Sequence, residues 1–363
     1  MGPLLVSAYD EVAQLLTDKR WSVHQAYSST IDTIFDRVEP AQTFLAGIGK
    51  SDDPTHARLR RLLSKWFTPQ TVEKWTGLIS VIIDDLLSQA KDRSEFDLMR
   101  DFALPIPQRL MSEILGVPYA DRNKLTTWGL AIINRPIDGG SDASRRVLTE
   151  AMEELCAYLD ALIADRRDQP GDDLLSSLVQ AQEGSDRLNS RELVAICTEL
   201  ISGGHETTSN LIANASILLM QNKTELDRML ADPSLVAGAV EESLRLEPPT
   251  MYSHPRLATE PMMLGGEKIE RGDIAFGLFA AANRDPARFD DPDRFVIDRP
   301  NNQHFSFAFG MHFCLGAALG RIEAAQALME LFGRFPRISM VDQTILWKRH
   351  MRMHGPLRLP VRL

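Results

Sequence analysis

Cysteine is scarce in this chain, whose 363 residues contain only Cys156, Cys197 and Cys314. Their odd number and wide separation exclude a disulfide framework and the usual zinc spacings. No apolar run is long enough to cross a bilayer, and the first nine residues have neither the basic start nor the apolar stretch of a signal peptide. We therefore expect a protein that works in a reducing cytoplasm without a membrane.

Positive charge is also in short supply, because 50 acidic residues outnumber 40 lysines and arginines and give a formal net charge of -10. This balance argues against nucleic acid as the main partner. Internal repeats and low-complexity linkers are missing. With 44% hydrophobic residues the chain has ample material for a large core. We expect a single domain over residues 1–363.

Helical periodicity dominates residues 52–250, and Asn189 with Glu192 forms a capping-box pattern before a long helix. Short apolar runs separated by turns then predict strands within residues 251–280 and 337–363. The fold class expected is mainly α with a smaller β region. The predicted helices are Tyr9 to Asp18, His56 to Phe67, Pro69 to Lys91, Arg100 to Leu115, Asp121 to Asn134, Asp142 to Arg167, Asn189 to Gln221 and Leu235 to Leu246.

The most informative segment is the glycine-rich loop over residues 305–316, which carries Cys314 at the start of a helix-patterned stretch. Unpaired backbone N–H groups at a helix start favour a thiolate, so we expect a lowered pKa and a sulfur that binds metal. Gly310 and Gly316 have no side chains and let a flat partner approach the backbone. The alternative is a buried structural cysteine.

This loop resembles the haem-binding loop of the cytochrome P-450 family, through Phe307, Gly310, His312, Cys314 and Gly316. Alanine stands at position 308, where the family often has glycine. The resemblance covers nearly the whole chain and implies a triangular helical prism around haem b with an axial Cys314 thiolate. Family members usually carry some tens of residues ahead of the segment that begins at Leu4, so we expect either a truncated chain or a smaller β region.

Two adjacent glycines, Gly203 and Gly204, stand in the middle of the long helix, where each costs about 1 kcal/mol relative to alanine. Such a weak point predicts a kink or a widening that makes room for a ligand. Gly204, Glu206 and Thr207 match the family's oxygen-handling helix. The resemblance implies that the acid and the alcohol deliver protons to bound oxygen. The alternative is a kinked helix with solvated polar residues. His205 is expected to be a surface or packing residue.

Four cationic or hydrogen-bonding residues resemble the groups with which the family holds the haem propionates: His56, Arg60, Arg256 and His312. His56 and Arg60 share a helix face at i and i+4 spacing, and arginine pairs well with carboxylates. An ordinary basic helix face is the alternative for this pair. Nearby Arg58, Arg61 and Lys65 are expected on a solvated face that docks an acidic ferredoxin.

A structural ion network is predicted from Glu242 and Arg245, which resemble the family's Glu-x-x-Arg motif. Arg294 is expected as its third charged member, with Arg299 as a rival. The network would fix the irregular segment that leads into the Cys314 loop.

The resemblance therefore implies a haem-thiolate monooxygenase that inserts one atom of O2 into a small apolar or amphipathic substrate, in secondary metabolism. No flavin or nicotinamide fingerprint is present, so electrons from NAD(P)H would come through a ferredoxin and its reductase to a monomeric enzyme. A peroxide-driven peroxygenase and a non-catalytic haem or gas-binding protein are the alternatives. Expected apolar pocket contacts are Phe35, Phe44, Ile132, Met251, Met351 and Met353.

Overall fold

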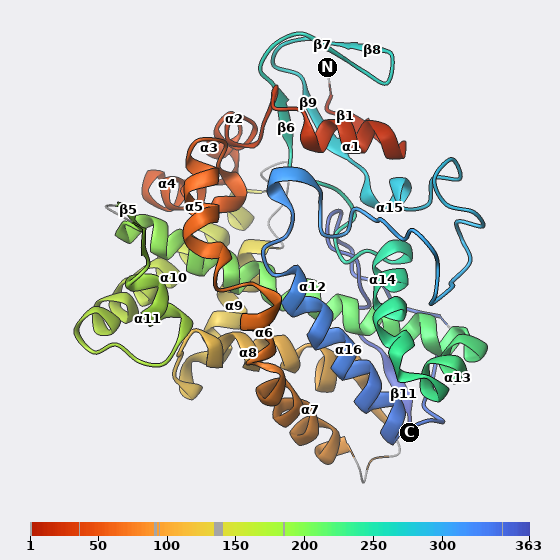
Figure 1. The fold of residues 1–363 in the computed structure, drawn as a ribbon. Helices are drawn as coiled ribbons and strands as arrows, with labels where there is room; N and C mark the ends of the chain where they lie inside the picture. The colour runs from red at the N-terminus through yellow and green to blue at the C-terminus, as the bar shows by residue number, and fades with distance from the viewer. Residues whose placement is uncertain are drawn as a thin grey trace.

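The computed structural model describes residues 2–35, 37–90, 93, 95–133, 141–183, 186–342 and 344–363. The fold is mainly α with a smaller β region, as the sequence predicts (Figure 1). The longer helices are α1 (Tyr9–Thr17), α4 (Val38–Leu45), α5 (Thr55–Ser64), α7 (Thr76–Ala90), α8 (Pro105–Ile114), α9 (Arg122–Ile133), α10 (Asp142–Asp168), α12 (Ser190–Gln221), α13 (Lys223–Ala231), α14 (Val236–Leu246) and α16 (Ala317–Arg334). Shorter ones are α2 (Val23–Ser28), α3 (Ile31–Ile34), α6 (Pro69–Glu73), α11 (Leu174–Val179) and α15 (Phe279–Ala282).

Helix ends follow local chemistry where the sequence supplies it. The Asn189 side chain accepts a hydrogen bond from the Glu192 N–H at 3.0 Å, and the Glu192 carboxylate accepts the Asn189 N–H at 2.9 Å, which confirms the capping box. The helix predicted to start at Arg100 instead begins with a π-helical turn (Met99–Ala103) and continues as α8 from Pro105. Proline fits this position because the first helical N–H has no partner within the helix.

The β region is larger than the sequence predicts, because N-terminal segments join it. One sheet has the order β1-β9-β6-β2, in which β1 runs parallel to β9 and the other pairs are antiparallel. Residues of β1 and β2 are too few to show a strand period, and their partners lie more than 200 positions away. The strands are β1 (Leu4–Val6), β2 (Trp21–Ser22), β3 (Glu95–Asp97), β4 (Gln182–Glu183), β5 (Asp186–Arg187), β6 (Arg256–Ala258), β7 (Met262–Leu264), β8 (Glu267–Ile269), β9 (Ile274–Gly277), β10 (Ser339–Met340) and β11 (Pro360–Arg362).

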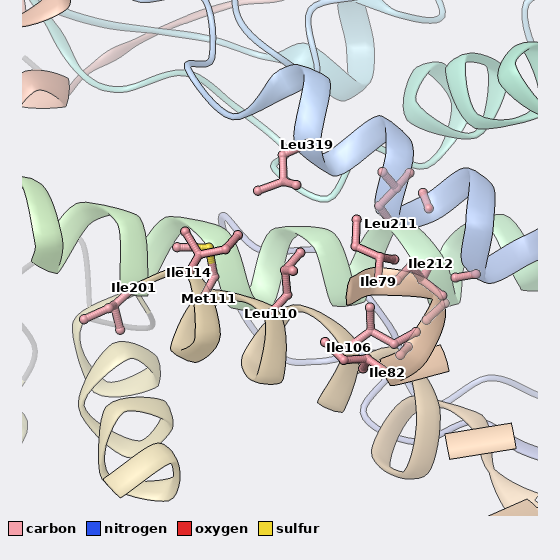
Figure 2. Packing of buried hydrophobic residues seen from close by; sticks show 14 of the residues in the cluster. Ile79, Ile82, Ile106, Leu110, Met111, Ile114, Ile201, Leu211, Ile212 and Leu319 are labelled. Carbon is pink, nitrogen blue, oxygen red and sulfur yellow. The ribbon is translucent and has the colours of Figure 1, made fainter. Parts of the chain in front are cut away.

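Helix α12 crosses the middle of the molecule and is buried along most of its length (Figure 1). Figure 2 shows Leu110 and Met111 of α8 on one side of it and Leu319 of α16 on the other. A helix that is buried all round must be packed on several faces. Its polar residues therefore face either other protein groups or an internal cavity. The candidate site is the cavity next to this helix.

Candidate functional site

A cavity lies between α12, the loop before α16 and the start of α5. Its wall brings together residues that are up to 337 positions apart in the sequence, from Leu16 to Met353, including most of those predicted above. The predicted residues that line it are His56, Arg60, Gly204, Thr207, Arg256, Phe307, His312, Cys314 and Gly316. Glu206 and Gly310 were also predicted, but they are not among the residues that line the cavity.

The loop that carries Cys314 is held by backbone and side-chain contacts. The Cys314 N–H donates to the Phe307 carbonyl at 2.8 Å, and Arg60 donates to the carbonyl of Phe313 at 2.6 Å. Gly310 has a φ of 70°, and a Cβ there would lie 3.1 Å from the Leu16 carbonyl oxygen in α1. Gly310 is therefore needed for the close approach of the loop to α1, while Gly316 borders open space.

Phe307 is fixed from the side of α16. The Arg321 guanidinium lies 4.4 Å from the centre of the Phe307 ring and makes a bidentate pair with Glu241 of α14, at 2.6 and 2.9 Å. Burial opposes ionisation of Glu241, but Arg321 and His304 hold its pKa at about 2. The charged pair thus ties two helices to the start of the cysteine loop.

The Cys314 thiol does not have the lowered pKa that the sequence predicts. Burial raises its pKa, and the Gly316 N–H with the charges of Arg60 and Arg321 offset this only in part. The sulfur has accessible surface because it faces the cavity. Desolvation outweighs the helix start here, because a thiolate is penalised more by a low dielectric than one N–H group can restore. A bound metal ion would remove the proton outright.

The glycine pair in α12 makes room without a break in the helix. Residues 201–209 are helical without interruption. No atom lies within 4 Å of where a Cβ of Gly203 would be, and a Cβ of Gly204 would lie 3.3 Å from Met111. The Thr207 hydroxyl donates to the Gly203 carbonyl at 2.5 Å. The open space next to α12 therefore comes from missing side chains.

Glu206 points away from the cavity into a buried polar contact. Its side chain is 1% exposed, and the Lys348 ammonium donates to its carboxylate at 2.9 Å and to the Asn210 side-chain oxygen at 2.9 Å. Neighbouring His205 is buried as a packing residue, and burial lowers its pKa to about 4. Both of its ring nitrogens lack a hydrogen-bond partner within the described part of the chain.

The four residues expected around an anion form one cluster. The rings of His56 and His312 are 4.5 Å apart, and burial together with Arg256, His56 and Arg60 lowers the pKa of His312 to about 2. Burial and then Arg60 lower the pKa of His56, and burial lowers that of Arg256 to about 10. Buried Nε of Arg256 and Nε2 of His312 have no hydrogen-bond partner among the described residues.

This cluster fits a dianionic ligand. The cluster contains two guanidinium groups and two imidazoles, and burial together with their positive charges lowers the pKa of the two histidines. Buried cations are normally paired, so the cluster requires negative charge nearby. Haem b offers two carboxylates on one edge, a flat body that fits beside Gly203 and Gly316, and an iron that takes a thiolate. The residues present therefore fit the group that the sequence implies.

The predicted ion network exists, with one member replaced. Arg245, which is fully buried, pairs with Glu242 at 2.7 and 2.8 Å. The third charge is Arg299, which donates to Glu242 at 2.9 Å, whereas Arg294 contributes its backbone carbonyl and has an exposed side chain. Arg294 was therefore the wrong choice and its rival Arg299 the right one.

Two other expectations need correction. Arg58 pairs with Asp186 and with Glu192 near the start of α12, so its charge serves internal packing and not a free face. Among the expected apolar contacts, Phe44, Ile132 and Met353 line the cavity, while Met351 is 77% exposed. Phe35 is buried against Phe44, and Met251 does not line the wall.

Sequence reasoning missed three polar residues. Lys348 lies 142 positions from Glu206, and Arg352 comes from the same tail, so no local spacing could reveal either. Glu323 lines the cavity, and burial raises its pKa to about 8. It follows Leu319 by one turn on the apolar face of α16. A carboxylate at such a position can be recognised in the sequence and could have predicted a buried acid.

The fold and the site fit a protein that would hold a flat, anionic group beside a cysteine sulfur. Comparison with known proteins agrees, because the family model described as Cytochrome P450 matches residues 6–349. The chain belongs to the cytochrome P450 family and is an oxidoreductase of the monooxygenase type that uses haem with a thiolate ligand and O2.

Individual relatives cover nearly all of this chain. Cytochrome P450 107B1 of Saccharopolyspora erythraea is 39% identical over 99% of this chain and 88% of its own length. Mycinamicin IV hydroxylase/epoxidase of Micromonospora griseorubida is 38% identical over 98% and 88%. The crystal structure of P450BioI in complex with a hexadec-9Z-enoic acid-ligated acyl carrier protein matches with a TM-score of 0.92 at 32% identity, covering 99% of this chain and 91% of that one.

Helices long and apolar enough to span a membrane do not occur in the described parts of the chain.

Proposed function

We propose that this protein hydroxylates a small apolar or amphipathic metabolite, with Cys314 as the iron ligand. The observation that carries the proposal is that one cavity is bounded by the Cys314 loop, by the cation cluster and by the open face of α12. The mycinamicin relative, whose name states hydroxylation and epoxidation, supports a role in secondary metabolism.

The cofactor would be held by charge and by shape. His56, Arg60, Arg256 and His312 are proposed to bind the propionates of haem b through charge-assisted hydrogen bonds. Phe307, Gly310 and Gly316 shape the loop beneath the ring, and Gly204 lets α12 pack closely on Met111. Haem bound to the Cys314 thiolate supplies the oxygen activation and the oxidising power for the C–H bond.

Protons are proposed to travel through Glu206 and Thr207. The Thr207 hydroxyl borders the cavity and donates to the Gly203 carbonyl, so it holds a hydrogen-bonding position next to the ligand space. Glu206 lies behind it and contacts Lys348, which connects the acid to a half-buried ammonium. The acid and alcohol together can relay protons while the apolar wall excludes bulk water.

Electrons are proposed to come from NAD(P)H through a ferredoxin and its reductase, because the sequence has no flavin or nicotinamide fingerprint. The remaining parts of the proposal are a single domain, a monomeric state, a cytoplasmic location and a structural role for the Glu242–Arg245–Arg299 network. A partly exposed basic face at Arg61 of α5 and at Lys65 just after it suits an acidic ferredoxin.

The decisive experiment is the absorption spectrum of the reduced, carbon-monoxide-bound protein. A strongly red-shifted Soret band is expected for the parent, and Cys314→Ala should lose it while Cys197→Ala, at a buried cysteine that does not line the cavity, keeps it. An unchanged band in Cys314→Ala would rule out Cys314 as the ligand.

Thr207→Ala tests the oxygen-handling role. We expect the variant to consume NAD(P)H at a comparable rate but to form about tenfold less product per electron pair, with release of peroxide. Full coupling of electrons to product would count against the role. Turnover with hydrogen peroxide but not with the ferredoxin system would favour the peroxygenase alternative.

A further inference from the structure

Three polar side chains, Tyr27, His254 and Arg352, form a chain of contacts that reaches the cavity wall. The Tyr27 hydroxyl lies 2.6 Å from Nδ1 of His254, and Nε2 of His254 lies 3.1 Å from Nη2 of Arg352. They come from α2, from the loop before β6 and from the C-terminal segment. His254 and Arg352 line the cavity.

The chemistry of the chain fixes the direction of its hydrogen bonds. A guanidinium group has N–H donors only, so Nε2 of His254 must accept from Arg352. The ring proton of a neutral His254 is then on Nδ1 and points at the Tyr27 oxygen. Arg352 is therefore held in place by an uncharged partner, and its positive charge is not neutralised by this contact.

Arg352 has no anionic partner among the described residues. No carboxylate there lies within ion-pair distance of it, and its Nε is shielded from solvent without a hydrogen-bond partner. Lys50, another cation on the cavity wall, pairs with Glu199 at 2.6 Å. A half-buried guanidinium that borders a cavity without a counter-ion is a site for an anion from outside the chain.

We do not expect the haem propionates to be the anion that binds Arg352. The charges that depress the pKa of His312 are those of Arg256, His56 and Arg60, and the same cluster already offers donors for two carboxylates. Arg352 lies on the C-terminal segment, where its carbonyl accepts the Met251 N–H and Met353 pairs with Thr250. It belongs to the part of the wall where Phe44, Ile132 and Met353 line the remaining space.

We infer that Arg352 binds a carboxylate of the substrate, held in position by His254 and Tyr27. The substrate class is an amphipathic carboxylic acid whose apolar body contacts the Phe44, Ile132 and Met353 wall. Arginine suits this task because two parallel N–H groups match both carboxylate oxygens. The inference rests on the proposed function, since it concerns the substrate side of the same cavity.

The test compares acids with their neutral analogues on the haem-loaded enzyme. Straight-chain acids from decanoic to hexadecanoic acid, and an aromatic and a polycyclic acid, would each be titrated beside the methyl ester, with affinity measured by spin-state shift and by calorimetry. At least one acid should bind at least tenfold more tightly than its ester. Arg352→Gln should abolish that preference, and Arg352→Lys should retain part of it.

Arg349→Gln is the matched control, because Arg349 is exposed on the same segment. It should keep both haem content and acid preference. The inference fails if no acid is preferred over its ester by the parent, or if Arg352→Gln keeps the preference. It also fails if Arg352→Gln loses haem while the haem-loaded fraction of the variant still prefers the acid over its ester. Arg352 would then hold a haem propionate. Failure of the proposed function is recognised separately, by the absence of the red-shifted Soret band in the parent.

Discussion

Ala308 is the residue at which the cysteine loop leaves low-energy backbone geometry. Its φ of 57° lies in the left-handed region, which costs a residue with a Cβ about 1–2 kcal/mol. Ala308→Gly removes this strain but loosens the unfolded chain by about 0.4–1 kcal/mol. We therefore expect a modest rise in the thermal unfolding midpoint of the haem-loaded protein. Ala308→Val, with a branched Cβ, should lower it, and equal midpoints for both variants would contradict the strain.

His205 makes the stability of the protein sensitive to acid. Its pKa is about 4 in the folded protein and about 6.5 when unfolded. Between these two pKa values the histidine is protonated in the unfolded state but neutral in the folded state. The free energy of unfolding therefore has its full value above the unfolded pKa and falls as the pH drops toward 4, by about 3 kcal/mol over this range.

The readout for His205 is urea unfolding at about pH 7 and about pH 5. The parent should lose roughly 2 kcal/mol more between these conditions than His205→Leu, which has no titrating group. The comparison uses the pH slope, so any packing change in the variant cancels. Equal slopes would mean that His205 is not buried in neutral form.

Among the longer elements, the C-terminal segment contacts α12 through Lys348 as well as through the His354 carbonyl, which accepts a hydrogen bond from Asn214. Lys348 contacts Glu206 and Asn210, and a Cβ on nearby Gly355 would lie 2.3 Å from the Asn210 side chain, so the segment packs tightly there. Lys348→Met removes one charged contact of the buried Glu206 carboxylate, which disturbs its position.

We expect Lys348→Met to lower turnover by about tenfold. This is a smaller effect than that of removing the Glu206 carboxyl group, because loss of a proton-transfer group typically costs a factor of about 100 or more. The solvent isotope effect on turnover should rise, whereas substrate affinity and the carbon-monoxide spectrum should not change. Lys348→Arg should restore most of the rate. If the isotope effect and the rate stay at parent values, Lys348 has no part in positioning Glu206.

Across the whole molecule, the sequence predicts what is local and misses what depends on pairing at a distance. Cys314, His56 and Arg60 carry their chemistry in short spacings, and the helix periods follow from burial of one face. Arg352 reaches the cavity, and Lys348 reaches Glu206, only because the tail folds back against α12 and the strand region. Arg299 and Arg294 could not be separated either, since the choice depends on the turn geometry between them.

The net charge of the protein affects the approach of an acidic ferredoxin. With a formal net charge of -10, a distant acidic ferredoxin is repelled, so productive docking depends on a local basic face. Arg61 of α5 is 52% exposed and lies 3.6 Å from Asp186, and Lys65, just after α5, is exposed. The charge of Arg58 is paired with Asp186 and Glu192. The double variant Arg61→Glu/Lys65→Glu should slow reduction by ferredoxin about tenfold at low salt.

Because salt screens such contacts, the defect should shrink as ionic strength rises from about 0.05 to about 0.5 M. Lys268→Glu is the matched control, since Lys268 is 72% exposed on the β7–β8 hairpin, well away from α5 (Figure 1). Stopped-flow reduction of all three proteins, with dithionite reduction to verify intact haem, gives the comparison. If the double variant and the control are reduced equally fast at low salt, electrons enter through a different face of the molecule.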